Sequence, residues 1–444
     1  MSSYCIKLTT FTILIALYAT SSARLNPVAA TSLEPGGTNF VVYDLGDYGL
    51  SMSADNFAKL DTQGGLKSVI GAYDLNPTLV KNQIDRMCSN GQRKIGFMLH
   101  HGRFAPYPNN TPLYNLSPDQ AYPQNSSIII INSTGGSLQP RHEQNLFNII
   151  DYIAKEGCFN EIQFRFAPSW YSFIGSWGDP TDWSNPTTGW QEGVYLENFA
   201  FIKSVRNLIQ NTLTQNQSNI KVYYDLAAET GGITYEYLVP DNDPIKNIKT
   251  TYYQVLTELY QKRLLTDYNQ QFGINDTYGF SIALIPGRFA RLMGVYDAIN
   301  IHPAQHAIDI YDVQNTGVTP VLTALSTEIQ QSGEVSTPII VQETYFNDLQ
   351  IYADLLSAKS QLGINIRTIM QWQTERAKTY RPNTTELSHF STTSTAYSYL
   401  DRYLAGDLNG DDHVDISDFN LLISKFGNPY TVSDFSAIIS NFGQ

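Results

Sequence analysis

The chain has 444 residues, 42% of them hydrophobic and 16% charged, which is the composition of a globular protein with a sizeable core. Its formal net charge of -13 excludes the classes of protein that depend on a basic surface. We therefore expect no nucleic-acid partner and no binding to anionic membranes.

Residues 1–23 have the pattern of a secretory signal peptide. One lysine precedes an apolar stretch from Phe11 to Tyr18, and Ser21, Ser22 and Ala23 supply the small residues that a signal peptidase recognises. The apolar stretch is too short to span a bilayer stably. We expect a secreted protein, extracellular or at the cell surface, without a membrane-spanning segment.

Residues 66–404 contain eight apolar runs of strand length that alternate with helical patterns. This alternation is typical of a parallel sheet, and eight units match a (β/α)8 TIM barrel of the α/β class. The predicted strands are 67–73, 94–99, 161–166, 220–226, 278–284, 296–301, 338–342 and 367–372. Residues 24–65 form an N-terminal extension, in which 39–43 is an extra strand or a plug of the barrel.

Long segments rich in Pro, Asn, Ser and Gly follow the second and third predicted strands, over 103–140 and 167–195. Both belong to the side of such a barrel on which active sites are built. Loops of this length are uncommon in compact domains, so we expect them to wall a cleft.

Cys88 and Cys158 remain once the signal peptide is removed. They end the helices before strands 2 and 3, so they hold equivalent positions in neighbouring units. A disulfide across the bottom of the barrel is one interpretation, since secreted proteins fold in an oxidising compartment. Two separate buried thiols are the other, because adjacent helices can hold Cα atoms beyond the bridging limit of about 7 Å.

Two glutamates stand where predicted strands 4 and 7 end. Glu229 lies within Ala-Ala-Glu-Thr-Gly-Gly, and Glu343 closes the apolar run of Ile-Ile-Val-Gln-Glu. Catalytic groups of such barrels lie at the C-terminal ends of strands. In these positions the barrel resembles the retaining glycoside hydrolases of clan A, without matching any one family. The resemblance implies cleavage of O-glycosidic bonds in a polysaccharide, with Glu229 as acid/base, Glu343 as nucleophile and no catalytic cofactor.

Other strand ends supply further candidates for substrate binding. His302 after strand 6 and Trp372 at strand 8 resemble substrate contacts of the clan, and Tyr345 lies two residues beyond the predicted nucleophile. Because successive strand residues point to opposite faces, only one of the adjacent histidines after strand 2 can line the pocket, and we assign His101 to it. Arg165 in strand 3 either orients a carboxylate at the site or forms a structural ion pair.

One position departs from the pattern of the clan. The clan has Asn immediately before its acid/base, where it contacts the 2-hydroxyl of the sugar, whereas this chain has Ala228. Either another residue supplies that contact, or the barrel is a catalytically inactive glycan-binding protein. A third interpretation is a scaffold-attached surface protein whose C-terminal tail is the functional part.

The tail, residues 405–444, combines a calcium-loop pattern with a short repeat. The segment Ile-Ser-Asp-Phe after Asp415 returns as Val-Ser-Asp-Phe after Thr431, and each copy ends in Phe-Gly. Oxygen ligands at positions 1, 3, 5, 7, 9 and 12 of such a loop enclose one calcium ion. Here they are Asp407, Asn409, Asp411, the His413 carbonyl, Asp415 and Asp418.

These features resemble a type I dockerin, a small all-α, EF-hand-like module that attaches secreted polysaccharide-degrading enzymes to a scaffold. The resemblance covers residues 405–444 and implies a structural Ca2+ and a cohesin-type scaffold as partner. In the second copy, the segment Asn428-Pro-Tyr-Thr431 is too short to hold calcium. We therefore expect one calcium site.

Overall fold

The structure is a computed structural model, and it describes residues 33–42, 67–103, 136–170, 182–229, 242–312, 317–346, 348–375, 389–390, 414–424, 426 and 432–443. The predicted signal peptide, residues 407–413 of the predicted calcium loop and most of the two long predicted loops lie outside these ranges. Among the described residues, no helix is long and apolar enough to cross a membrane.

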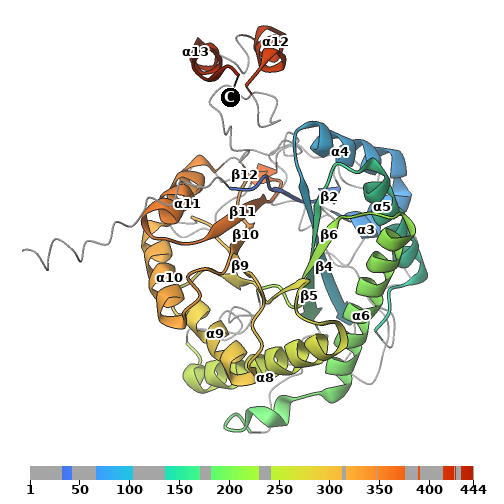
Figure 1. Cartoon of the computed structure of the whole chain (residues 1–444). Coiled ribbons are helices and arrows are strands. Elements are labelled where there is room, and N and C mark those ends of the chain that lie inside the picture. Colours follow the sequence, from blue (N-terminus) through green and yellow to red (C-terminus); the bar gives the residue numbers. More distant parts are fainter. Residues whose placement is uncertain are drawn as a thin grey trace, which may run out of the picture.

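The centre of the molecule is a curled sheet in which neighbouring strands run parallel (Figure 1). The strand order is β7-β6-β5-β4-β1-β11-β10-β9-β8. In chain order these strands are β1 (Gly37–Asn39), β4 (Lys94–Arg103), β5 (Glu161–Trp170), β6 (Lys221–Asp225), β7 (Thr277–Gly279), β8 (Ile282–Ala283), β9 (His306–Asp309), β10 (Ile339–Glu343) and β11 (Ile366–Gln371).

The two ends of this strand order come from one stretch of chain. Only Phe280 and Ser281 separate β7 from β8, and these two strands pair with β6 and β9 respectively. The sheet therefore curls back on itself and is barrel-like. The predicted α/β class is confirmed.

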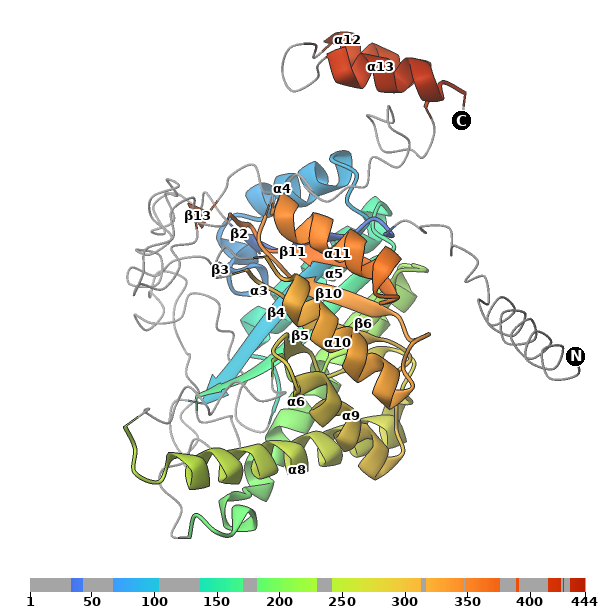
Figure 2. The same cartoon turned by 90° about the vertical axis from the view of Figure 1, so that its left-hand side faces the viewer.

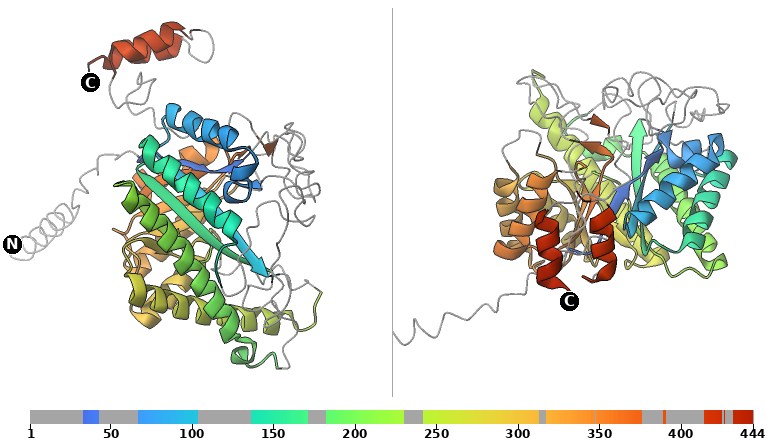
Figure 3. Two further views of the ribbon diagram at one scale, coloured as in Figure 1. Left: turned by 90° about the vertical axis from the view of Figure 1, so that its right-hand side faces the viewer. Right: turned by 90° about the horizontal axis from the view of Figure 1, so that it is seen from above.

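Helices lie around the outer side of the sheet (Figures 1, 2 and 3). The longer ones are α4 (Pro77–Ser89), α5 (Pro140–Glu156), α6 (Glu192–Gln215), α8 (Lys246–Phe272), α9 (Arg288–Ile299), α10 (Thr319–Ser332) and α11 (Leu349–Gln361). Local chemistry sets several of their ends. The Asn76 side chain accepts a hydrogen bond from the Leu79 N–H at the start of α4, and Gly157, with φ of 69°, ends α5.

Six predicted strands are confirmed. The range 94–99 overlaps β4, 161–166 overlaps β5, 220–226 overlaps β6, 278–284 overlaps both β7 and β8, 338–342 overlaps β10, and 367–372 overlaps β11. Their apolar runs are long enough to identify because both faces of a parallel barrel sheet are covered. In β10, for example, all five residues are buried.

The predicted first strand, 67–73, is wrong. Only Lys67 and Ser68 are extended; they form β3, which pairs antiparallel with β2 (Val41–Val42), and the helix α3 (Val69–Ala72) follows directly. The barrel position belongs to β1, which lies inside the predicted N-terminal extension, between β4 and β11. A side chain at Gly37 is excluded there, because a Cβ atom would lie 1.6 Å from the Lys94 carbonyl oxygen.

The predicted sixth strand, 296–301, is also wrong. Residues up to Ile299 belong to α9, and Asn300, with φ of 52°, ends that helix. Of the apolar residues that suggested a strand, Tyr296 belongs to the buried face of α9, Ala298 and Ile299 form the last turn of that helix, and Ile301 follows it. The strand that follows is β9, which ends at Asp309.

The two copies of the tail repeat form a pair of helices, α12 (Ile416–Ser424) and α13 (Val432–Asn441). Val414, Leu422 and Ile438 make a small buried cluster between them, separate from the core of the barrel. In the view of Figure 2, this pair lies above α4.

Cys88 and Cys158 form a disulfide, with their Cα atoms 5.8 Å apart. The bridge joins the end of α4 to the residue that follows the last turn of α5. This decides between the two interpretations of the sequence in favour of the bonded pair.

Replacing both cysteines by serine should lower the free energy of unfolding by about 4 kcal/mol, because the bridge links positions separated by 70 residues. Urea unfolding of the oxidised wild type and of the double variant measures the difference. Reduced wild-type protein serves as the control and should behave like the double variant. A double variant as stable as the oxidised wild type would contradict the expectation.

Candidate active site

A buried arginine, Arg165 of β5, lies at the centre of a group of acids inside the barrel. Its guanidinium contacts Asp309 through Nη2 at 2.9 Å, Asp225 through Nε at 3.5 Å, and Glu343 through Nη1. These carboxylates are the last residues of β9, β6 and β10. Because parallel strands end at the same side of a barrel, three distant segments bring their acids to one cation.

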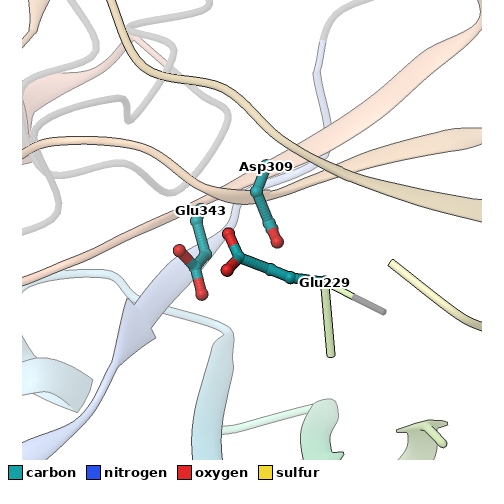
Figure 4. A group of neighbouring side chains, drawn as sticks. All are labelled: Glu229, Asp309 and Glu343. Carbon is teal, nitrogen blue, oxygen red and sulfur yellow. The ribbon is translucent and has the colours of Figure 1, made fainter. Parts of the chain in front are cut away.

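Glu229 joins this group from the turn that follows β6. Its φ of 55° is left-handed, which is uncommon for a residue other than glycine, and its N–H donates to the Ser281 hydroxyl at 3.0 Å. One carboxylate oxygen from each of Glu229, Asp309 and Glu343 lies within 4.8 Å of the others (Figure 4). We call Asp225, Glu229, Asp309 and Glu343 the acidic cluster.

Glu343 is held at both of its carboxylate oxygens. Arg165 donates to Oε1, and the Tyr311 hydroxyl donates to Oε2 at 2.6 Å. The ring of Tyr311 packs edge-on against Tyr345, with 4.8 Å between the centroids. Two donors, one within β5 and one just after β9, thus fix the Glu343 carboxylate in one orientation.

The electrostatics of the acidic cluster favour retained protons. Burial, followed by the charge of Glu343, raises the pKa of Glu229 to about 7, although Arg165 acts in the opposite direction. Burial also raises the pKa of Asp309 well above its ordinary range, and that of Asp225, against the opposing charge of Arg165. Four acids share one arginine, so the group cannot be fully ionised at low cost.

Proton transfer is the chemistry that this arrangement permits most directly. A carboxyl group with a pKa of about 7 can donate a proton near neutral pH and take one back. Glu343 is fixed by two donors, and one of its oxygens lies within 4.8 Å of one from Glu229, so it can act as a nucleophile toward an atom bonded to the one that is protonated.

Glu229, Asp309 and Glu343 also form a group that could hold a metal ion. Oxygen-rich sites of this kind suit hard cations such as Mg2+ or Ca2+. Arg165 contacts two of the three acids, so its guanidinium already supplies a positive charge at this place.

Two of the predicted substrate contacts lie near the acidic cluster. Tyr345 is buried against Tyr311, which holds Glu343. Trp372 directly follows β11, is partly buried, and donates its backbone N–H to the Thr344 carbonyl at 2.8 Å. Arg165 orients carboxylates, which is one of its two predicted roles.

The other two predicted contacts lie elsewhere, and both predictions are wrong. His302 precedes β9, at the end opposite to Asp309, and its ring contacts Asp297 and Glu334 at 3.2 Å each. His101 is buried between the sheet and α6, where its ring stacks on Phe201 with 4.6 Å between the centroids. The first error follows from the misplaced sixth strand, and the second from the choice of strand face.

Sequence reasoning missed Asp309 and Tyr311. The signal for them is the segment after His306, where Ala-Ile is closed by Asp309 just as Ile-Ile-Val-Gln is closed by Glu343 in β10. Asp225 lies within a correctly predicted strand, but its contact with Arg165 spans 60 residues and has no local signature.

Comparison with known proteins does not assign this chain to a family. No family model matches the sequence, and no curated protein matches it. Twelve chains of solved structures match this chain. One is a glucosidase from Croceicoccus marinus, with 10% identity and a TM-score of 0.25; the match covers 68% of this chain and 57% of that one.

Glu229→Gln should stabilise the fold at pH 8 by on the order of 2 kcal/mol and change little at pH 4. The folded-state pKa of Glu229 is raised from 4.5 to about 7, so ionisation above that pH opposes folding. Glutamine removes the charge and therefore this opposition. Thermal unfolding across pH measures the effect.

Glu334→Gln is the matched control with the opposite sign. A hydrogen bond from His306 lowers the pKa of Glu334 to about 2, so its charge supports folding at neutral pH. This variant should be less stable at pH 8. A loss of stability in Glu229→Gln at pH 8 would contradict the account of the acidic cluster.

Proposed function

We propose that the chain is a secreted glycoside hydrolase that cleaves O-glycosidic bonds of a polysaccharide by a retaining two-glutamate mechanism. The observation that carries the proposal is the pairing of Glu229 and Glu343, whose carboxylate oxygens approach within 4.8 Å. Retaining enzymes place their carboxyl groups about 5 to 5.5 Å apart, whereas inverting enzymes need about 6.5 to 9.5 Å to admit a water molecule. The two groups also differ as the mechanism requires, since one holds a proton and the other is fixed by donors.

In the first step, a Glu343 oxygen attacks the anomeric carbon while Glu229 donates its proton to the leaving glycosidic oxygen. The bond to the leaving group breaks, and a glycosyl ester forms on Glu343. Arg165 and Tyr311 hold the nucleophile in line for this attack.

In the second step, Glu229 takes a proton from water, and the water oxygen attacks the anomeric carbon to release the sugar and Glu343. Formation of the ester has meanwhile removed the charge of Glu343, which is the second cause of the raised pKa of Glu229. The pKa of Glu229 falls accordingly, but burial still keeps the group basic enough to act as general base.

Reducing-sugar release across a panel of polysaccharides tests the proposal. Glu343→Gln should abolish hydrolysis while sparing glycan binding, and Glu229→Gln should lower kcat by about 100- to 10,000-fold. Wild-type activity should fall as pH rises through about 7, because Glu229 then loses the proton that it donates.

The control is Glu156→Gln at the exposed end of α5, which should leave activity unchanged. Hydrolysis that survives in Glu343→Gln would contradict the assigned nucleophile. A wild type that binds glycans but releases no sugar would instead favour a catalytically inactive glycan-binding barrel. Ala228 is the residue that supports this second candidate, because its methyl group offers no hydrogen bond to a sugar.

For the tail, we propose a dockerin-like module with one structural Ca2+ and a cohesin-type scaffold as partner. The pairing of α12 with α13 around a small core supports this proposal. Equivalent positions of the two copies expose apolar side chains: Ile423 and Ile439 are 60% and 59% exposed, and Phe426 and Phe442 are 55% and 54% exposed. A matched pair of exposed apolar sets suits a protein partner.

Calcium titration of the full chain by calorimetry should give one site. Asp418→Ala should abolish it, because this aspartate occupies position 12 of the loop. Asp434→Ala, at the equivalent position of the second copy, is the control and should not alter binding. Capture by a cohesin in calcium, lost in chelator, tests the partner, and calcium binding unaffected by Asp418→Ala would contradict the assigned loop.

A further inference from the structure

Asp309 has one carboxyl oxygen with an assigned contact and one without. Oδ2 accepts a hydrogen bond from Arg165 Nη2 at 2.9 Å. Oδ1 is buried and makes no hydrogen bond within the described part of the chain. Asp309 as a residue is only 1% exposed. A buried oxygen without a partner is costly, so its presence at a site indicates a ligand that completes it.

Asp225 gives the internal comparison. It is also fully buried and also contacts Arg165, through Oδ2. Its Oδ1, however, accepts the backbone N–H of Ser281 at 3.1 Å. Both oxygens of Asp225 thus have protein donors. A carboxylate that balances the charge of Arg165 can therefore have both of its oxygens satisfied, so that role does not explain why Oδ1 of Asp309 has no hydrogen-bond partner within the described part of the chain.

The position of Asp309 places that oxygen beside the reacting groups. A carboxylate oxygen of Asp309 lies within 4.8 Å of one from Glu229 and of one from Glu343, and Figure 4 shows the three carboxylates converging. A sugar held for attack by Glu343 would have its anomeric carbon between the two glutamates, and the hydroxyl on the adjacent ring carbon within reach of Asp309.

We propose that Asp309 is a substrate-binding residue whose Oδ1 hydrogen-bonds the ring hydroxyl next to the anomeric carbon. The inference rests on the proposed glycosidase function and sharpens its substrate class to sugars that carry this hydroxyl. Ala228 cannot make the contact, and Asp309 approaches the same region from a different strand. Deoxy sugars at that ring position are correspondingly poor substrates.

The protonation of Asp309 suits this role. Burial raises the pKa of Asp309 well above its ordinary range, and Oδ2 is engaged by the arginine, so a proton on this side chain would lie on Oδ1. A neutral carboxyl group can donate to the hydroxyl oxygen without adding a further negative charge beside Glu343.

A substrate-by-variant cycle tests the proposal. The substrates are the 4-nitrophenyl glycoside that the wild type cleaves best and its 2-deoxy analogue. The wild type should favour the parent over the analogue by about 10- to 100-fold in kcat/KM, since the contact involves a buried polar group. In Asp309→Ala, kcat/KM for the parent glycoside should fall by that factor, and kcat/KM for the 2-deoxy analogue should change very little.

Two variants control for structural effects. Asp225→Ala removes a buried carboxylate that contacts the same arginine, but neither of its oxygens lacks a protein partner. This variant should therefore lower kcat/KM by the same factor for both substrates. Asp309→Asn keeps a hydrogen-bond donor at the position and should keep most of the preference for the parent substrate. This variant also tests the proposal if Asp309→Ala does not fold. An equal loss on both substrates in Asp309→Ala would overturn the proposal and leave the hydrolase intact.

A wild type that cleaves no glycoside would count against the proposed function instead. The same cycle is then run by calorimetry with methyl glycosides of glucose, galactose and xylose and with their 2-deoxy forms. Loss of binding to the parent sugar alone in Asp309→Ala would support the contact. Equal binding of both sugars by the wild type, or no binding of either, would overturn it.

Discussion

The buried charge of Arg165 is the constraint on which the rest of the site depends. A guanidinium inside a barrel is stable only when acids surround it, and here those acids close β6, β9 and β10. The ion pairs therefore connect strands that are far apart in the sequence and bring their C-terminal ends to one point. The acidic cluster therefore depends on the correct pairing of these strands in the barrel.

The number of acids gives the cluster its chemistry. Arg165, with the weaker effect of Arg288 on Glu229, cannot balance four carboxylates, so protons stay on the acids that are most deeply buried or least well paired. Glu229, at a left-handed turn outside the direct contacts of Arg165, keeps a proton up to about pH 7. Glu343, with a donor on each oxygen, is the fixed partner. A pair of glutamates in different states thus follows from the shortage of positive charge.

The sequence predicted those parts of the fold and site that have a local signature. Glu343 was identifiable because its buried strand stops at a carboxylate, and most strands were identifiable from their apolar runs. β1 was missed because Gly-Thr-Asn carries no strand signal, and β9 because the apolar residues around the end of α9, over 296–301, resemble a strand. The partners of Arg165 lie 60, 144 and 178 residues along the chain, and no local pattern encodes such contacts.

The central claim is that Glu343 forms a covalent bond to the sugar, and that Glu229 then directs water to the face from which the leaving group departed. The stereochemistry of the first product tests it most directly. Proton NMR of a glycoside during the first minutes of hydrolysis resolves the two anomers of the released sugar before they interconvert. The account predicts release of the anomer with the configuration of the substrate. Release of the opposite anomer would contradict it.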